Sequence, residues 1–225
     1  MSGGDVATIA AVALVPLVAL TLSAFVKTSV VMALLRNALG APQAPPDLVV
    51  TGLALLLTVF VMTPVARDVI AAVEAAPAVA PASPGAPPPT PYQFDPDVAP
   101  PGGWLAAGER AAAPVRAFLA RHAHADDKAA FAQVATELRG APVGQDDLTV
   151  LSVAFVASEL AEAFAIAFLV FLPFLVIDLV VGVALGALGL STVQPQTVAL
   201  PVKLILFVAV DGWRLLLLGL VRGYA

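Results

Sequence analysis

Six of the ionisable side chains inside or beside the long apolar stretches of this sequence are candidate functional groups, because a charge there is costly. They are Lys27, Glu159, Glu162, Asp178, Lys203 and Asp211. A charge at the centre of a membrane helix costs roughly 2.5 to 3.5 kcal/mol on insertion scales, so we expect these groups to serve a function or an assembly contact. Lysines and carboxylates in apolar segments predict mutual compensation across helices or across copies of the chain. The spacing leaves open which groups pair.

Asp178 is the clearest case, because residues 168–181 read FLVFLPFLVIDLVV and hold no other charge. Two interpretations fit this carboxylate. It makes a contact that requires a charge, or it lies near a helix end and its side chain reaches towards water. We favour the first. Pro173, in the same run, predicts a kink or a restart of the helix.

Enzymatic chemistry finds little support in the sequence. Glu159 and Glu162 are three residues apart, a spacing that suits a catalytic or metal-binding carboxylate pair on one helix. His122 and His124 have no partner at ligand spacing, and no phosphate-binding loop or hydrolase motif occurs. We therefore predict no enzyme, no metal and no cofactor, and we interpret the two glutamates as polar helix contacts, for example to a neighbouring subunit.

The composition is that of a membrane protein. The 225 residues are 60% hydrophobic and 12% charged, with a mean hydropathy of +0.96. The net charge is −5 and the eleven basic residues are scattered, so nucleic acid is not an expected partner. The chain has no cysteine, and its uncharged stretch from Val6 to Val26 predicts a retained membrane segment rather than a cleaved leader.

Four apolar blocks are expected to form helices. They are Val6–Leu35, Leu48–Val65, Val150–Leu190 and Val198–Val221. The second block has the length of one ordinary membrane crossing, whereas the first would overshoot the bilayer as a single helix, at about 45 Å. Lys203, Asp211 and Arg214 divide the fourth into pieces too short to span. Much of the helical surface must then face protein or a watery passage, which indicates an oligomer or a pore.

A hydrophilic region separates the second block from the third. Residues 76–101 contain ten of the twenty prolines and read as a linker, extended or disordered. Helical spacing after Asp126 and a stop at Gly140 predict a short amphipathic helix, with a less regular helix around 104–120. The organisation we predict is all-α, with four long hydrophobic and partly kinked segments. Its regions are an N-terminal membrane hairpin (1–66), a linker (67–102), a hydrophilic helical insert (103–149) and a C-terminal membrane hairpin (150–225).

Motifs in both halves of the chain resemble the FliP/SctR family of membrane proteins of bacterial type III secretion systems. In the first half they are LLRNALG at 34–40, PP at 45–46, GLAL at 52–55 and FVMTP at 60–64. In the second half they are FVASELAEAF at 155–164, FLPFLVIDLVV at 171–181, LPVKL at 200–204 and DGW at 211–213. Several motifs in the same order make this a more specific match than hydropathy alone.

The resemblance implies a subunit of an export gate in the bacterial inner membrane. It implies a pentamer that assembles with two smaller membrane proteins of the same apparatus, contacts lipid, and forms a channel for unfolded secreted proteins. It also implies that the hydrophobic helices are largely lifted out of the bilayer plane. Phe25-Val-Lys27 is more similar to the injectisome branch than to the flagellar branch, which remains the alternative.

Two positions depart from the family pattern. Ala167 stands where relatives usually have glycine. The turn Leu190-Ser191-Thr192-Val193 stands where relatives often carry a methionine cluster that seals the pore, and serine and threonine lack the deformability of methionine. We still mark this turn as a candidate gasket. A secondary transporter that uses Asp178 and Lys203 as a coupling site is a further hypothesis, although it does not account for the ordered motifs.

Overall fold

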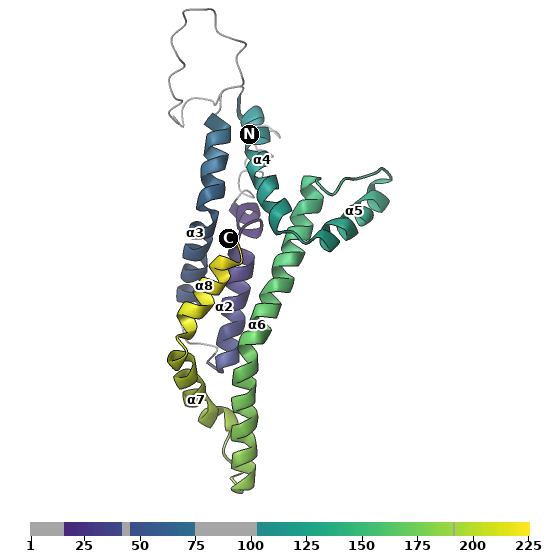
Figure 1. The fold of residues 1–225 in the computed structure, drawn as a ribbon. Helices are drawn as coiled ribbons and strands as arrows, with labels where there is room; N and C mark the ends of the chain where they lie inside the picture. Colours follow the sequence, from purple (N-terminus) through teal and green to yellow (C-terminus); the bar gives the residue numbers. More distant parts are fainter. Residues whose placement is uncertain (1–15, 42–45, 75–102, 191) are drawn as a thin grey trace, which may run out of the picture. The chain divides into compact units, whose positions relative to one another are not determined.

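The computed structural model describes residues 16–41, 46–74, 103–190 and 192–225, and every regular element in these ranges is a helix (Figure 1). The helices are α2 (Phe25–Leu39), α3 (Asp47–Glu74), α4 (Gly103–His122), α5 (Ala125–Arg139), α6 (Leu148–Ala187), α7 (Pro195–Ala209) and α8 (Gly212–Arg222). The predicted all-α fold class is confirmed.

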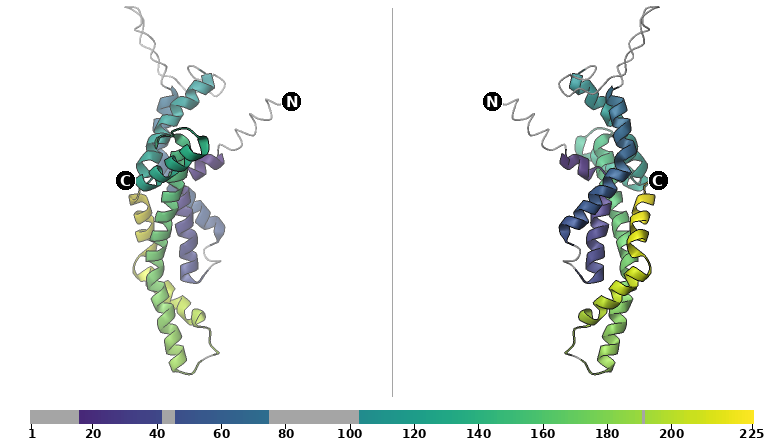
Figure 2. Two further views of the ribbon diagram at one scale, coloured as in Figure 1. Left: turned by 90° about the vertical axis from the view of Figure 1, so that its right-hand side faces the viewer. Right: turned by 90° about the vertical axis from the view of Figure 1, so that its left-hand side faces the viewer.

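Within the described ranges, two helices, α3 and α6, are long and apolar enough to cross a membrane. The pair α7 and α8 would make a third span if taken together, but the two helices are bent by 61° (Figure 2). The fourth apolar block is therefore broken into two helices, and Asp211 lies at the break between them. This agrees with the expectation that its charges divide it into pieces too short to span a membrane.

The first apolar block is not one helix in its described part. Residues 16–21 are helical, residues 22–24 form a turn, and α2 begins at Phe25. The Ser23 hydroxyl donates to the Leu20 carbonyl at 2.8 Å and accepts from the Phe25 N–H at 3.3 Å, so the side chain satisfies backbone groups at the break. Residues 6–15 lie outside the described ranges. α2 ends at Gly40, whose φ of 76° is a conformation that glycine adopts readily.

The third block forms one uninterrupted helix of 40 residues, with Pro173 inside it. Of the two alternatives expected at Pro173, a kink or a restart, the uninterrupted helix excludes the restart. Proline removes one backbone hydrogen bond, but the helix continues on both sides of Pro173, from Leu148 to Ala187, where the other backbone groups remain hydrogen-bonded. α3 likewise continues to Glu74, through eight residues that the sequence had placed in the linker. Residues 65–74 hold neither glycine nor proline, so nothing in the sequence ends the helix there.

The chain forms two compact units, Met1–Val61 with Phe155–Ala225, and Met62–Ala154. The core of the first unit contains residues of α2, α6, α7 and α8 that are almost fully buried. They include Val31, Met32, Leu35, Ala163, Phe174, Phe207, Leu216 and Leu220. The first unit thus joins the N-terminal and C-terminal apolar blocks in one core.

The second unit contains the predicted hydrophilic helices. α4 runs through Pro114, and α5 ends at Gly140 with a φ of 64°, so both helices predicted in this region are present. Arg110 of α4 donates to the carbonyls of Ala72 and Val73 at 3.0 and 3.2 Å, which satisfies acceptors at the end of α3.

Candidate functional site: two buried ion-pair clusters

The first cluster joins α2 to α6. Lys27, in the first turn of α2, lies 3.1 Å from Glu159 Oε1 and 2.6 Å from Glu162 Oε2. The two glutamates are three positions apart on α6, so both reach the same face of that helix. The Lys27 and Glu159 side chains are 2% and 1% exposed, whereas Glu162 is 36% exposed. The cluster therefore places a lysine and a glutamate in the interior, with a second glutamate at its edge.

Tyr224, which follows α8, completes this cluster. Its hydroxyl donates to Glu159 Oε2, and its ring centroid lies 4.2 Å from Lys27 Nζ. Burial, and then the negative charge of Glu159, raise the pKa of the Tyr224 hydroxyl, so the hydroxyl keeps its proton and acts as a donor. The first cluster consists of Lys27, Glu159, Glu162 and Tyr224.

The second cluster joins α6, α7 and α2. Lys203 Nζ of α7 lies 2.6 Å from Asp178 Oδ2 of α6 and donates to the Ala38 carbonyl of α2 at 3.2 Å. The Lys203 side chain is 5% exposed. Its ammonium group thus neutralises a carboxylate and binds a carbonyl in the last turn of α2, where the helix dipole favours positive charge. Asp178 Oδ1 is buried and accepts no hydrogen bond from the described residues.

Asp211 belongs to neither cluster. It lies in the bend between α7 and α8 with a φ of 54°, and its carboxylate is 3.7 Å from Arg214, both side chains being exposed. The neighbouring Gly212 packs closely against an aromatic ring, because a Cβ at this position would lie 2.3 Å from the Phe207 ring. Phe207 also packs edge-on against Trp213, at 5.3 Å between centroids. The DGW motif therefore shapes the bend. Among the described residues, the ion-pair partner of Asp211 is the exposed Arg214 and not a member of either cluster.

The candidate gasket is exposed in its described part. Leu190, Thr192 and Val193 are exposed, and Ser191 lies outside the described residues. The turn follows Gly189, whose φ is 72°.

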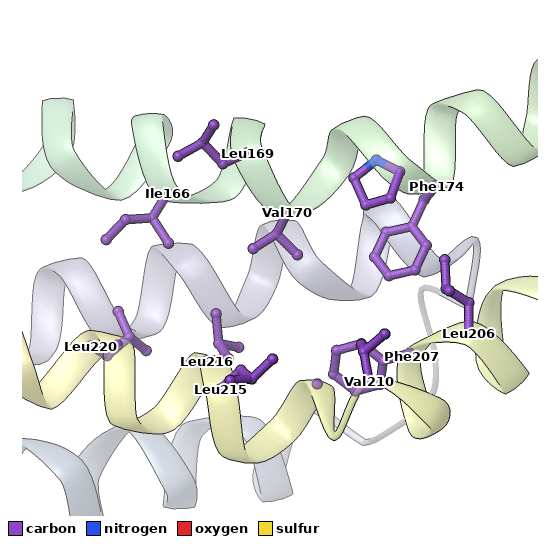
Figure 3. A pocket seen from close by; sticks show the side chains of 13 residues that line it. Ile166, Leu169, Val170, Phe174, Leu206, Phe207, Val210, Leu215, Leu216 and Leu220 are labelled. Carbon is purple, nitrogen blue, oxygen red and sulfur yellow. The ribbon is translucent and has the colours of Figure 1, made fainter.

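An apolar groove of about 440 Å³ lies between α6 and the bent pair α7 and α8 (Figure 3). Figure 3 shows Ile166, Val170 and Phe174 of α6 facing Leu216 and Phe207 across it. In the described ranges, no group of three or more His, Cys, Asp or Glu residues is placed to hold a metal ion.

The arrangement of the clusters is suited to fixing helices. Buried charges are stable only when paired and hydrogen-bonded, so each cluster restricts the relative position of the helices that supply its members. The two lysines and all three carboxylates of the clusters could be identified from the sequence, but Tyr224 and the Ala38 carbonyl could not. A tyrosine outside any motif and a backbone acceptor give no pattern that a sequence could reveal.

Comparison with known proteins assigns the chain to a family. The FliP family model matches residues 8–220. Hypersensitivity response secretion protein HrcR of Ralstonia nicotianae is 41% identical over 95% of this chain and 93% of its own length. Flagellar biosynthetic protein FliP of Pectobacterium carotovorum is 43% identical over 93% of this chain and 73% of its own length, and Yop proteins translocation protein R of Yersinia pestis is 38% identical over 94% and 91%. The family-model match covers almost the whole chain and every member of the two ion-pair clusters except Tyr224. It shows that the chain belongs to the FliP family.

Proposed function

We propose that this chain is a subunit of a type III protein-export gate, without enzymatic activity, through which unfolded proteins leave the bacterial cytoplasm. The observation that carries the proposal is the family match over residues 8–220, together with relatives whose names state secretion or translocation. A solute transporter would account for the buried Lys203–Asp178 pair but not for this match.

The proposed setting is the inner membrane, as a pentamer with two smaller membrane proteins of the export apparatus. Two long apolar helices support the membrane location. Large apolar side chains on α3 and α6 also support it, since Phe60, Phe164, Phe168 and Leu179 are all more than half exposed in the single chain. So large an apolar surface requires lipid or protein to cover it.

In this proposal the ion-pair clusters keep the subunit in one shape. α6 supplies carboxylates to both clusters, and α2, α7 and α8 are held to it through Lys27, Lys203 and Tyr224. A subunit that lines a passage for unfolded chains must resist competing contacts with them. Paired charges in an apolar core add the directionality that apolar packing lacks.

We place the chain in the injectisome branch rather than the flagellar branch. The names of HrcR and of the Yop translocation protein support this placement, whereas the identity values, 41% and 38% against 43% for a flagellar relative, do not separate the branches.

Deletion of the gene in its own bacterium tests both statements. Secretion through the injectisome should stop, swimming should persist, and a plasmid copy should restore secretion. Loss of swimming with intact secretion would place the chain in the flagellar branch. Intact secretion and intact swimming would contradict the proposed function.

A further inference from the structure

The first cluster contains more acid than base. Lys27 is the one basic group in it, and it faces two carboxylates, Glu159 and Glu162. Glu162 is partly exposed and lies nearer to the ammonium, at 2.6 Å against 3.1 Å for Glu159. Glu162 therefore suffices to neutralise Lys27, and Glu159 is the surplus carboxylate in the most buried position.

Glu159 needs a second donor because burial removes water from both of its oxygens. Oε1 lies 3.1 Å from the Lys27 ammonium and forms an ion pair with it. Oε2 accepts its hydrogen bond from the Tyr224 hydroxyl. A buried carboxylate without a donor is strongly destabilising, so the tyrosine supplies what the lysine does not.

Tyr224 also connects a third segment to the cluster. It lies just beyond α8, and Leu220, one turn earlier, is 1% exposed within the core of the first unit. We infer that Tyr224 is a positioning residue: its hydroxyl stabilises the surplus carboxylate of Glu159, and this bond holds the end of α8 against α2 and α6.

If the Tyr224 hydroxyl stabilises Glu159 in this way, a second substitution at Glu159 should rescue the loss of the hydroxyl. Removing the hydroxyl should loosen α8, because it leaves a buried charge without its donor. Replacing Glu159 by glutamine should then restore the docking, because the surplus charge is gone and Lys27 keeps Glu162 as its partner. A tyrosine that merely filled space would show no such rescue.

Thiol labelling tests this directly, because the chain has no cysteine of its own. Leu220→Cys introduces one buried thiol on α8, and its reaction with a maleimide in membrane vesicles reports how often α8 opens. Tyr224→Phe should raise the labelling rate about tenfold, the loss expected for a hydrogen bond to a charged group. Adding Glu159→Gln should return the rate to within about threefold of the parent. Tyr92→Phe, which removes the other tyrosine hydroxyl of the chain, is the matched control and should change nothing.

Two results would overturn the inference. One is a labelling rate in Tyr224→Phe equal to that of the parent. The other is a Tyr224→Phe/Glu159→Gln variant that labels as fast as Tyr224→Phe or faster. The labelling does not depend on secretion, so its outcome is separate from that of the proposed function. If the proposed function holds, secretion should fall in Tyr224→Phe and recover in the double variant.

Discussion

At the scale of single residues, α2 is held at both ends by buried ammonium groups. Lys27 lies in its first turn and binds carboxylates of α6. Lys203 of α7 binds the Ala38 carbonyl in its last turn and the Asp178 carboxylate of α6. Because α6 supplies the acids at both ends, α2 is fixed to α6 at two points separated by three turns of helix.

Breaking the second cluster should be costly. The Lys203 side chain is 5% exposed and that of Asp178 is 31% exposed, so loss of the carboxylate leaves a buried ammonium without its partner, with an expected loss of up to about 3 kcal/mol. Lys203→Ala or Asp178→Asn should therefore impair assembly or secretion while membrane insertion continues, which secretion assays and membrane fractionation measure together. Normal secretion by both variants would contradict a functional role for this pair.

The exposed pair in the same unit is the matched control. Asp211 and Arg214 are 3.7 Å apart and both largely exposed, so Arg214→Ala should cost less than about 1 kcal/mol.

The sequence identified Asp211 together with Asp178 as a charge in an apolar segment. Sequence periodicity could not show that Asp178 joins an ion-pair cluster while Asp211 stays exposed, because the bend between α7 and α8 turns Asp211 outward. The assembly roles of the six charged residues stay predictions.

At the scale of elements, the bend between α7 and α8 depends on aromatic packing over a glycine. Gly212→Ala would place a Cβ against the Phe207 ring, which must then move away from Phe174 and Trp213. We expect a loss of about 1 to 3 kcal/mol, typical of overpacking, measured by thermal unfolding of the purified protein in detergent.

Two further variants make this prediction specific. Gly219→Ala, on the same helix, meets nothing within 4 Å and should be neutral or slightly stabilising. Phe207→Leu should recover part of the stability lost in Gly212→Ala, because the smaller side chain vacates the space. Equal effects of Gly212→Ala and Gly219→Ala would show that the ring does not set the bend.

The beginning of α6 carries a pH-dependent cap. Asp147 accepts hydrogen bonds from the Thr149 hydroxyl and from the Thr149 N–H, the latter at 2.9 Å, and Arg139 lies 3.2 Å away. These groups, Thr149 first, lower the pKa of Asp147 to about 2. A lowered pKa means that the stabilisation is complete above the ordinary aspartate range and is lost as the pH falls towards 2.

Asp147→Asn should accordingly speed hydrogen exchange of the Thr149 amide near pH 6, and the difference from the parent should shrink towards pH 2. An effect of the same size at both pH values would assign the protection to something other than the carboxylate charge.

At the scale of the whole molecule, the linker is expected to be dispensable. Deleting residues 78–92 should leave secretion intact, because Arg110 already binds the last carbonyls of α3 and so joins α3 to α4 without it. Secretion by the deletion strain is the measurement. A strain that cannot secrete would show that the proline-rich segment binds a partner.

The helical class, the order of the helices and the family could be predicted from the sequence, because hydropathy and motifs are local properties. The turn at 22–24 and the unbroken passage of α6 through Pro173 could not, since both depend on how the helices pack. The same holds for the ion pairs. Lys27 and Glu159 lie far apart in the chain, and only the shared core of the two apolar halves brings them together.

Electron microscopy of the complex purified in mild detergent tests the central claim most directly. We predict class averages of a ring of five copies around a central channel, with the two smaller membrane proteins co-purifying and a detergent belt covering only part of the apolar helices. A monomer or dimer with no membrane partner would contradict the assignment of this chain to an export gate.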